Sequence, residues 1–189
     1  MAKRPPKDFE IKLLNERHDR AGFTRGVESL DRYLTAQAGQ DVRREANAVF
    51  VLTKRGEPAR ILGYYTLSAM ALSQGDVPEA ARKQVPRYPL VSATLIGRLA
   101  VATDQQRRGL GAILLADALR RAVESANTVG SPMVFVDALD ENAAKFYAAH
   151  GFVHLPTRSG LSCRCGLLRR WLIDDSCARK RLRERRALG

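Results

Sequence analysis

The residues from Gln106 to Gly111 have the types and spacing expected of a phosphate-binding loop. They read Gln-Arg-Arg-Gly-Leu-Gly and lie between an apolar strand pattern and an apolar helix pattern. Gly109 and Gly111 carry no Cβ, so a ligand can approach the main chain closely. The N–H groups of a first helical turn attract phosphate, and Arg107 and Arg108 add positive charge. A tight turn without a ligand is the alternative interpretation.

Together with two further motifs, this loop resembles a known family. Gln106-x-x-Gly109-x-Gly111 after an apolar strand resembles the acetyl-CoA signature of the GNAT N-acetyltransferases. A second matching element follows: Val134-Phe135-Val136-Asp137-Ala138, Asn142 and Phe146-Tyr147-x-x-x-Gly151-Phe152. The first part of the chain resembles one GNAT branch, the toxins of toxin–antitoxin pairs that acetylate aminoacyl-tRNA: Phe23-x-x-Gly26-Val27-x-x-Leu30-Asp31-x-Tyr33-Leu34 and Ala38-x-Gln40-Asp41. The resemblance spans residues 9–156.

The resemblance implies an α/β fold of three layers with a central mixed sheet. Acetyl-CoA would bind at a splayed strand pair and a helix N-terminus. The main chain of Leu99 and Val101 would hold the pantetheine arm, and an N–H group of one of the two would polarise the thioester carbonyl. The residues implied in cofactor binding are Leu99, Ala100, Val101, Gln106, Arg107, Arg108, Gly109, Leu110, Gly111 and Asn142. Asn142 fits a helix N-terminal cap equally well.

Tyr147 is the candidate general acid. A phenol with an unperturbed pKa near 10 stays protonated at neutral pH and can give its proton to a departing thiolate. The alternative interpretation is a packed helix residue whose hydroxyl is hydrogen-bonded. The resemblance favours the catalytic role.

The resemblance also implies the acceptor and the partners. Acetylation of the α-amine of aminoacyl-tRNA would remove the nucleophile needed for peptide bonding and arrest translation. The implied partners are aminoacyl-tRNA, a cognate antitoxin protein and a second copy of the chain in a homodimer. Two other functions stay open: a GNAT enzyme acting on a small amine or a protein N-terminus, and an inactive basic module that binds RNA or a partner.

A proline-bearing segment at residues 74–90 interrupts the strand pattern and carries Arg82, Lys83 and Arg87. It is either a solvated connector or a lobe that faces the substrate. In the second case these three side chains would contact tRNA phosphates.

Hydrophobic periodicity predicts the elements that position these residues. We expect strands at 9–14, 48–52, 61–68, 91–101 and 133–136, helices at 27–39, from 109 onward and from 140 to 150, and a turn at 127–132. Tyr64 and Tyr65 should face opposite sides of their sheet. One GNAT domain would occupy residues 1–156.

Composition sets broad limits on function. The 189 residues are 45% hydrophobic and 28% charged, and the net charge of +12 favours a polyanionic partner, either CoA phosphates or nucleic acid. No apolar run approaches the roughly 20 residues of a membrane helix, and no secretory signal is evident, so we expect a cytoplasmic protein that does not enter a membrane. We expect no metal site, because His18, His150 and His154 are scattered.

Residues 157–189 depart from the family as a basic tail. Residues 161–189 hold nine Lys/Arg and three Asp/Glu, which gives 9 − 3 = +6 of the total charge. The toxin branch usually ends in a strand that resembles Leu-x-Leu-Pro-Leu. Codons permitted for Thr157 to Asp174, read two nucleotides on, yield Pro-Gln-Arg-Leu-Val-Leu-Pro-Leu and later a stop. We hypothesise an out-of-frame segment from about Pro156 onward; the alternative is a genuine tail that is amphipathic or binds RNA.

Overall fold

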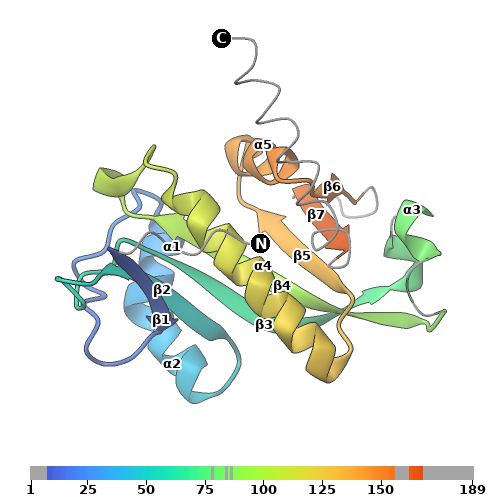
Figure 1. Ribbon diagram of the computed structural model, residues 1–189, viewed down its shortest axis with the longest axis horizontal. Helices are drawn as coiled ribbons and strands as arrows, with labels where there is room; N and C mark the ends of the chain where they lie inside the picture. Colours follow the sequence, from blue (N-terminus) through green and yellow to red (C-terminus); the bar gives the residue numbers. More distant parts are fainter. Residues whose placement is uncertain (1–7, 78, 84, 86, 156–161, 168–189) are drawn as a thin grey trace, which may run out of the picture.

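A seven-stranded sheet forms the centre of the computed structural model, which describes residues 8–77, 79–83, 85, 87–155 and 162–167 (Figure 1). Its strand order is β1-β2-β3-β4-β5-β7-β6. β4 and β5 are parallel and the other neighbours antiparallel, so the predicted mixed sheet is confirmed. The strands are β1 (Phe9–Leu13), β2 (Ala48–Lys54), β3 (Gly63–Ser73), β4 (Leu90–Val101), β5 (Met133–Ala138), β6 (Val153–His154) and β7 (Ser162–Leu167).

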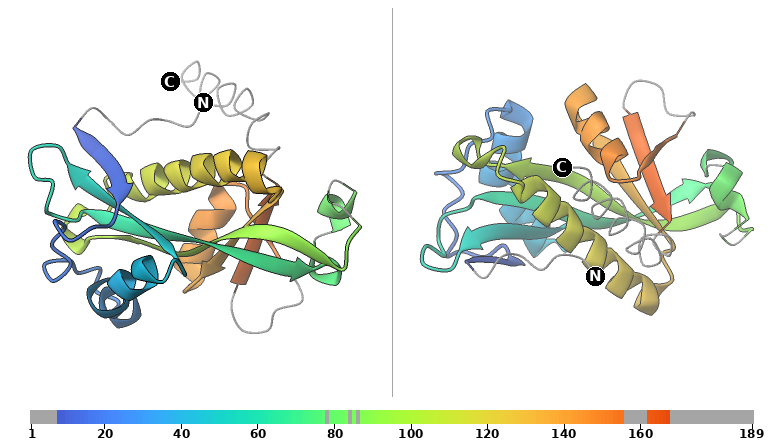
Figure 2. Two further views of the ribbon diagram at one scale, coloured as in Figure 1. Left: turned by 90° about the horizontal axis from the view of Figure 1, so that it is seen from below. Right: turned by 45° about the horizontal axis from the view of Figure 1, so that its top comes forward.

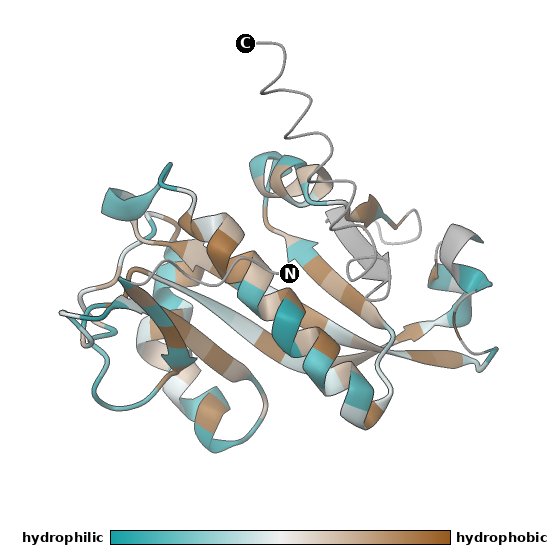
Figure 3. Ribbon diagram, viewed as in Figure 1, coloured by the Kyte–Doolittle hydropathy of each residue, from teal (hydrophilic) through white to brown (hydrophobic). Residues whose placement is uncertain are grey.

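Helix α4 (Leu110–Val129) covers one face of the sheet (Figure 2). Figure 3 shows polar residues along the outward side of α4 and apolar residues throughout most of β5. The apolar side of α4 is buried, as Leu110, Leu114, Leu115, Ala118, Leu119 and Ala122. Helix α5 (Glu141–Ala149) adds Ala144 and Tyr147 to the same core. The predicted turn at 127–132 was wrong at its beginning, because α4 continues to Val129 and ends at Gly130, whose φ is 70°.

A buried carboxylate ties α4 to the sheet. Asp117 accepts hydrogen bonds from the Tyr65 hydroxyl at 2.6 Å and from Arg120 and Arg121 at 2.8 Å each. Burial alone would raise the pKa of Asp117, but these hydrogen bonds outweigh it and lower the pKa. The Arg121 guanidinium also lies over the Phe50 ring, 4.1 Å from its centroid.

The opposite face is covered by one helical stretch made of α1 (Glu28–Arg32), a π-helical segment η1 (Tyr33–Gln37) and α2 (Ala38–Arg43). It buries Tyr33 and Leu34 against Tyr64. The predicted helix at 27–39 is confirmed and extends four residues further. Tyr64 faces this side and Tyr65 faces α4, as alternation along the strand predicted.

A bulge interrupts β4 beside the candidate site. Tyr65 pairs with Leu99 and Leu67 with Ile96, so two residues of β4, Gly97 and Arg98, lie opposite one residue of β3. A bulge bends its strand and turns a side chain to a new direction. Here the side chains of Ile96 and Leu99 both face α4, although they are three residues apart.

The segment at 74–90 forms a lobe at the far end of β3 and β4. It contains η2 (Gln74–Asp76) and the short helix α3 (Glu79–Arg82). Val77 and Val85 anchor it by packing into a small core with Leu72. Among the described residues, no helix is long and apolar enough to cross a membrane.

Part of the predicted tail belongs to the sheet. β7 lies between β5 and β6 and pairs antiparallel with both. Residues 157–161 and 168–189 of that tail lie outside the described residues. The hypothesis of an out-of-frame segment therefore stays a prediction.

Candidate active site

The loop before α4 presents main-chain donors in the way its sequence predicted. Arg107 and Gly109 both have positive φ, of 60° and 77°, and Gly109 caps the helix without a side chain. The first main-chain hydrogen bond across the helix start runs from the Ile113 N–H to the Gly109 carbonyl. The N–H groups of Leu110, Gly111 and Ala112 have no acceptor in the part of the chain that the structure describes. Such a terminus binds an anion.

Gly109 leaves the space in front of this loop open, and Gly111 packs closely against neighbouring elements. A Cβ built at Gly109 would meet no atom within 4 Å, so a ligand there would not displace protein atoms. A Cβ at Gly111 would lie 3.7 Å from Phe146 and 3.9 Å from Val101, which is ordinary packing distance. The first turn of α4, the end of β4 and helix α5 therefore converge at Gly111. Because Gly109 has no side chain, a ligand atom can approach the N–H donors of this loop closely.

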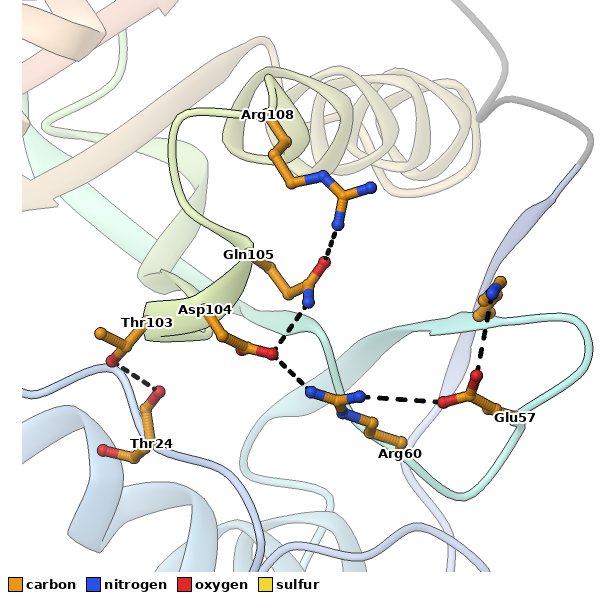
Figure 4. A network of polar contacts seen from close by, with 8 residues as sticks. Thr24, Glu57, Arg60, Thr103, Asp104, Gln105 and Arg108 are labelled. Atoms are coloured by element: carbon orange, nitrogen blue, oxygen red, sulfur yellow. Dashed lines mark hydrogen bonds and ion pairs between the residues drawn. The ribbon is translucent and has the colours of Figure 1, made fainter.

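A chain of side-chain contacts holds the loop in place (Figure 4). Arg108 donates from Nη1 to Gln105 at 2.6 Å, and Gln105 donates from Nε2 to Asp104 at 2.9 Å. Arg60, from the turn before β3, pairs with the same Asp104 oxygen. The hydrogen bond from Gln105, with the positive charge of Arg60, lowers the pKa of Asp104. These contacts hold Arg108 beside the start of α4.

The strands β4 and β5 separate next to this loop. Their pairing runs from Ala93–Met133 only to Ile96–Val136, whereas β4 continues to Val101. The edge of β4 from Gly97 to Val101 has therefore lost β5 as its neighbour. This confirms the predicted splayed strand pair. The main chain of Leu99 and Val101, which the resemblance assigned to the pantetheine arm, lies on that edge, together with that of Ala100.

Tyr147 lies in the core that α4 and α5 share, with an exposed fraction of 4%. Its ring makes edge contacts with Phe146 and Phe152, at centroid distances of 5.3 and 5.6 Å. Among the described residues its hydroxyl has no hydrogen-bond partner. Burial, and then the negative charge of Asp137, raise the pKa of Tyr147 well above its usual value. The phenol is therefore protonated at neutral pH.

Asn142 does not cap α5. The cap is Asp140, whose carboxylate accepts from the Ala143 N–H at 2.7 Å. Asn142 is an exposed residue of the first helical turn. The cap alternative for Asn142 was wrong, and its contact with CoA stays a prediction.

The three basic residues of the lobe lie far from the loop before α4 (Figure 1). Gly63 pairs with Val101 at one end of β3, and Ser73 pairs with Leu90 at the other. Ten residue steps along a strand span about 33 Å. Arg82 donates to the carbonyls of Val77 and Gly75 at 2.9 Å each, so it holds the lobe together. Lys83 and Arg87 are exposed.

Sequence reasoning did not single out Arg98. Its signal was a lone basic residue in the apolar run Leu95-Ile96-Gly97-Arg98-Leu99-Ala100-Val101. The bulge places its side chain on the face opposite α4, above Tyr33.

A separate cavity of about 590 Å³ lies under the C-terminal half of α4, lined among others by Phe50, Met70 and Arg121. No predicted site residue lines it, so we do not assign it to the acetyl transfer. In the described ranges of the chain, no group of His, Cys, Asp or Glu side chains could hold a metal ion.

Comparison with known proteins agrees with this geometry. The family described as acetyltransferase (GNAT) domain matches residues 45–154. The tRNA-acetylating toxin of Mycobacterium tuberculosis (strain ATCC 25618 / H37Rv) is 33% identical over 144 residues, which cover 76% of this chain and 84% of the toxin.

Two solved structures share the fold. AtaT complexed with acetyl-methionyl-tRNAfMet has a TM-score of 0.80 at 27% identity, covering 88% of this chain and 98% of AtaT. A tyrosine-to-phenylalanine mutant of AtaT, bound to the C-terminus of the antitoxin AtaR and acetyl-CoA, has a TM-score of 0.72 at 26% identity, covering 86% of this chain and 95% of AtaT. With its splayed strands, open helix terminus and buried tyrosine, the chain belongs to the GNAT acetyltransferase family.

Proposed function

We propose that this protein is an N-acetyltransferase that moves the acetyl group of acetyl-CoA to the α-amine of aminoacyl-tRNA. The observation that carries the proposal is the separation of β4 from β5 beside the open terminus of α4. This arrangement offers a main-chain edge and an anion site next to one another, and we assign the role of proton donor to Tyr147 of α5.

The chain's own groups bind the donor by its two ends. The N–H groups after Gly109 and the guanidinium of Arg108 would take the pyrophosphate, and the free edge of β4 would take the pantetheine arm by strand-like hydrogen bonds. Acetyl-CoA supplies the activated acyl group as a thioester. Fixing its carbonyl beside an incoming amine supplies a large part of the rate enhancement by positioning. A main-chain N–H of Leu99 or Val101 would stabilise negative charge on the carbonyl oxygen.

Tyr147 completes the proton balance. The neutral amine forms the new C–N bond, the C–S bond breaks, and the sulfur leaves with the electron pair. Tyr147 gives its proton to that sulfur as general acid, the amine releases one proton to solvent, and Tyr147 takes a proton back from solvent before the next turnover. The buried site keeps the phenol protonated until the thiolate forms.

The acceptor is inferred from the relatives. A toxin that is 33% identical over most of both chains is named for acetylating tRNA, and AtaT has been solved with acetyl-methionyl-tRNA. The net charge of +12 suits a polyanionic substrate. Acetylated aminoacyl-tRNA lacks the amine needed for peptide-bond formation, so the protein would arrest translation.

The same relatives indicate the partners. AtaT binds the C-terminus of its antitoxin AtaR, and we propose that a cognate antitoxin neutralises this chain in the same manner. We also propose a homodimer. Because charged tRNA is its substrate, we place the protein in the cytoplasm.

The test is transfer of labelled acetyl from acetyl-CoA to three acceptors: total charged tRNA, the same tRNA after deacylation, and a mixture of free amines and peptides. We expect label in charged tRNA and none in deacylated tRNA, which lacks the α-amine. Label only in amines or peptides would mean a GNAT enzyme with another acceptor. RNA binding without any turnover would mean an inactive binding module.

A further inference from the structure

Arg98 lies at the β4 bulge with its side chain on the face opposite α4. Its Cζ is 3.6 Å from the centroid of the Tyr33 ring, a cation–π distance. Its main-chain N–H donates to Thr66 Oγ1 at 3.1 Å. The bulge thus fixes the main chain of Arg98, and the buried Tyr33 ring fixes the position of its guanidinium.

The guanidinium has no hydrogen-bond acceptor among the described residues, although Arg98 is partly buried. The two carboxylates near Tyr33 are already engaged. Asp41 accepts from the Tyr33 hydroxyl at 2.9 Å and from Asn47 at 2.7 Å. Asp31 accepts from main-chain N–H groups of the preceding loop. A partly buried cation without an acceptor is costly, which points to a ligand that supplies one.

The place of Arg98 indicates which ligand this is. Leu99 and Val101 pack toward α4, where the donor would lie, whereas Arg98 faces the α1–α2 side. An acceptor that reaches the thioester carbonyl from the α1–α2 side passes Arg98, which is one residue from Leu99. A planar guanidinium fork matches the oxygens of a phosphate in a bidentate manner.

We infer that Arg98 binds the phosphate of the 3′-terminal nucleotide of the acceptor, one ribose away from the aminoacyl group. The inference rests on the proposed acetylation of aminoacyl-tRNA and adds a recognition residue to that same site. It makes Arg98 a positioning residue: the phosphate contact sets where the α-amine lies relative to the thioester, and the proton transfer is left to Tyr147.

The experiment compares two small acceptors on the same enzyme. One is 3′-aminoacylamino-3′-deoxyadenosine, and the other is its 5′-monophosphate; both carry the α-amine, and their amide bond resists hydrolysis. We expect the wild-type protein to prefer the phosphorylated acceptor by about 10-fold to 100-fold in kcat/KM, the usual effect of a hydrogen bond to a charged group. Arg98→Gln should abolish this preference. Arg98→Lys should keep part of it, because lysine retains the charge without the fork.

The matched control is Arg32→Gln. Arg32 is exposed and lies beside Tyr33 in the chain, so the variant removes the same charge near the same face. It should keep the full preference. Because the preference is a ratio measured on one protein sample, partial unfolding of a variant cancels.

Two results would overturn the inference. If Arg98→Gln keeps the preference, or if wild-type enzyme that acetylates charged tRNA shows none, Arg98 does not bind this phosphate. If the wild type binds acetyl-CoA by calorimetry but acetylates neither analogue nor charged tRNA, the proposed function itself fails, and the role of Arg98 fails with it.

Discussion

Replacing Tyr147 by phenylalanine should lower the rate of acetyl transfer and raise the free energy of unfolding. The substitution removes one hydroxyl and keeps the ring between Phe146 and Phe152. In the described part of the chain that hydroxyl is buried without a hydrogen-bond partner, so it contributes no stabilising contact there. A structural tyrosine would lose stability on this change, and a general acid would lose turnover.

The magnitudes follow from these surroundings. A buried polar group without a partner costs about 1–3 kcal/mol, so Tyr147→Phe should raise the free energy of unfolding by about 1 kcal/mol. A positioned general acid contributes at least about 100-fold to the rate, which is about 2.7 kcal/mol in the activation free energy. Acetyl-CoA affinity should change little, because the donor is bound through main-chain groups.

The assay combines three measurements: kcat for transfer to charged tRNA, acetyl-CoA affinity by calorimetry, and thermal unfolding. Tyr65→Phe is the matched control. Its hydroxyl donates to Asp117 at 2.6 Å in the same core, so this variant should lose about 1–3 kcal/mol of stability and keep its kcat. The raised pKa of Tyr147 also predicts that its titration causes no loss of wild-type rate up to about pH 10.

Near-normal turnover in a stable Tyr147→Phe protein would refute the general-acid role. A lower melting temperature together with normal turnover would mean that Tyr147 is a packing residue whose hydroxyl is satisfied. Both outcomes are distinguishable from the expected pattern in one set of experiments.

Three further expectations concern the cofactor loop, the lobe and the buried carboxylate. Gly111→Asp should sharply weaken acetyl-CoA binding by calorimetry, because it puts a negative charge at the helix start. Gly111→Ala should bind acetyl-CoA almost normally, since its Cβ fits at 3.7 Å from Phe146. Equal affinities of the two variants would place the cofactor elsewhere. Lys83→Ala combined with Arg87→Ala should weaken charged-tRNA binding and flatten its dependence on salt without changing acetyl-CoA affinity, and an unchanged salt series would mean a solvated connector. Because the pKa of Asp117 is lowered in the folded state, its contribution to the free energy of unfolding is complete above the unfolded pKa and is lost as the pH falls through the folded pKa. The loss of stability with falling pH should therefore be less steep in Asp117→Asn than in the wild type.

The features that the sequence predicted are those that local patterns encode. The stripe of α4 repeats at helical spacing, and Tyr64 and Tyr65 alternate along a strand, so their faces follow from geometry alone. Gly109 at a strand-to-helix junction predicted the open terminus. The family resemblance added the splay of β4 and β5, which no local pattern reveals.

The features that were missed depend on residues distant in the chain. Arg60 and Asp104 are 44 positions apart, and their pairing follows from where the β2–β3 turn lies in the fold. At the β4 bulge, Thr66 on β3 lies opposite two residues of β4. The sequence of either strand alone does not reveal this register. The position of the Arg98 guanidinium depends on η1, which places the Tyr33 ring beneath it. Asn142 was a candidate cap because asparagine is a good N-cap residue. Asp140, two positions earlier, is an equally good cap by residue type, and the structure has Asp140 as the cap.

The free edge of β4 has a consequence for the lifetime of the protein. The row of main-chain groups from Gly97 to Val101 exists only in the folded chain, so a donor that binds along it stabilises the native state at the expense of the unfolded one. A ligand at 100 times its dissociation constant adds about 2.7 kcal/mol, a sizeable fraction of the total stability of an ordinary domain. CoA keeps the same arm and phosphates after the acetyl group has left, so the product protects the chain as the substrate does. Resistance to unfolding and to proteases would therefore follow the total CoA pool of the cell, while the rate of acetylation follows only its acetylated part.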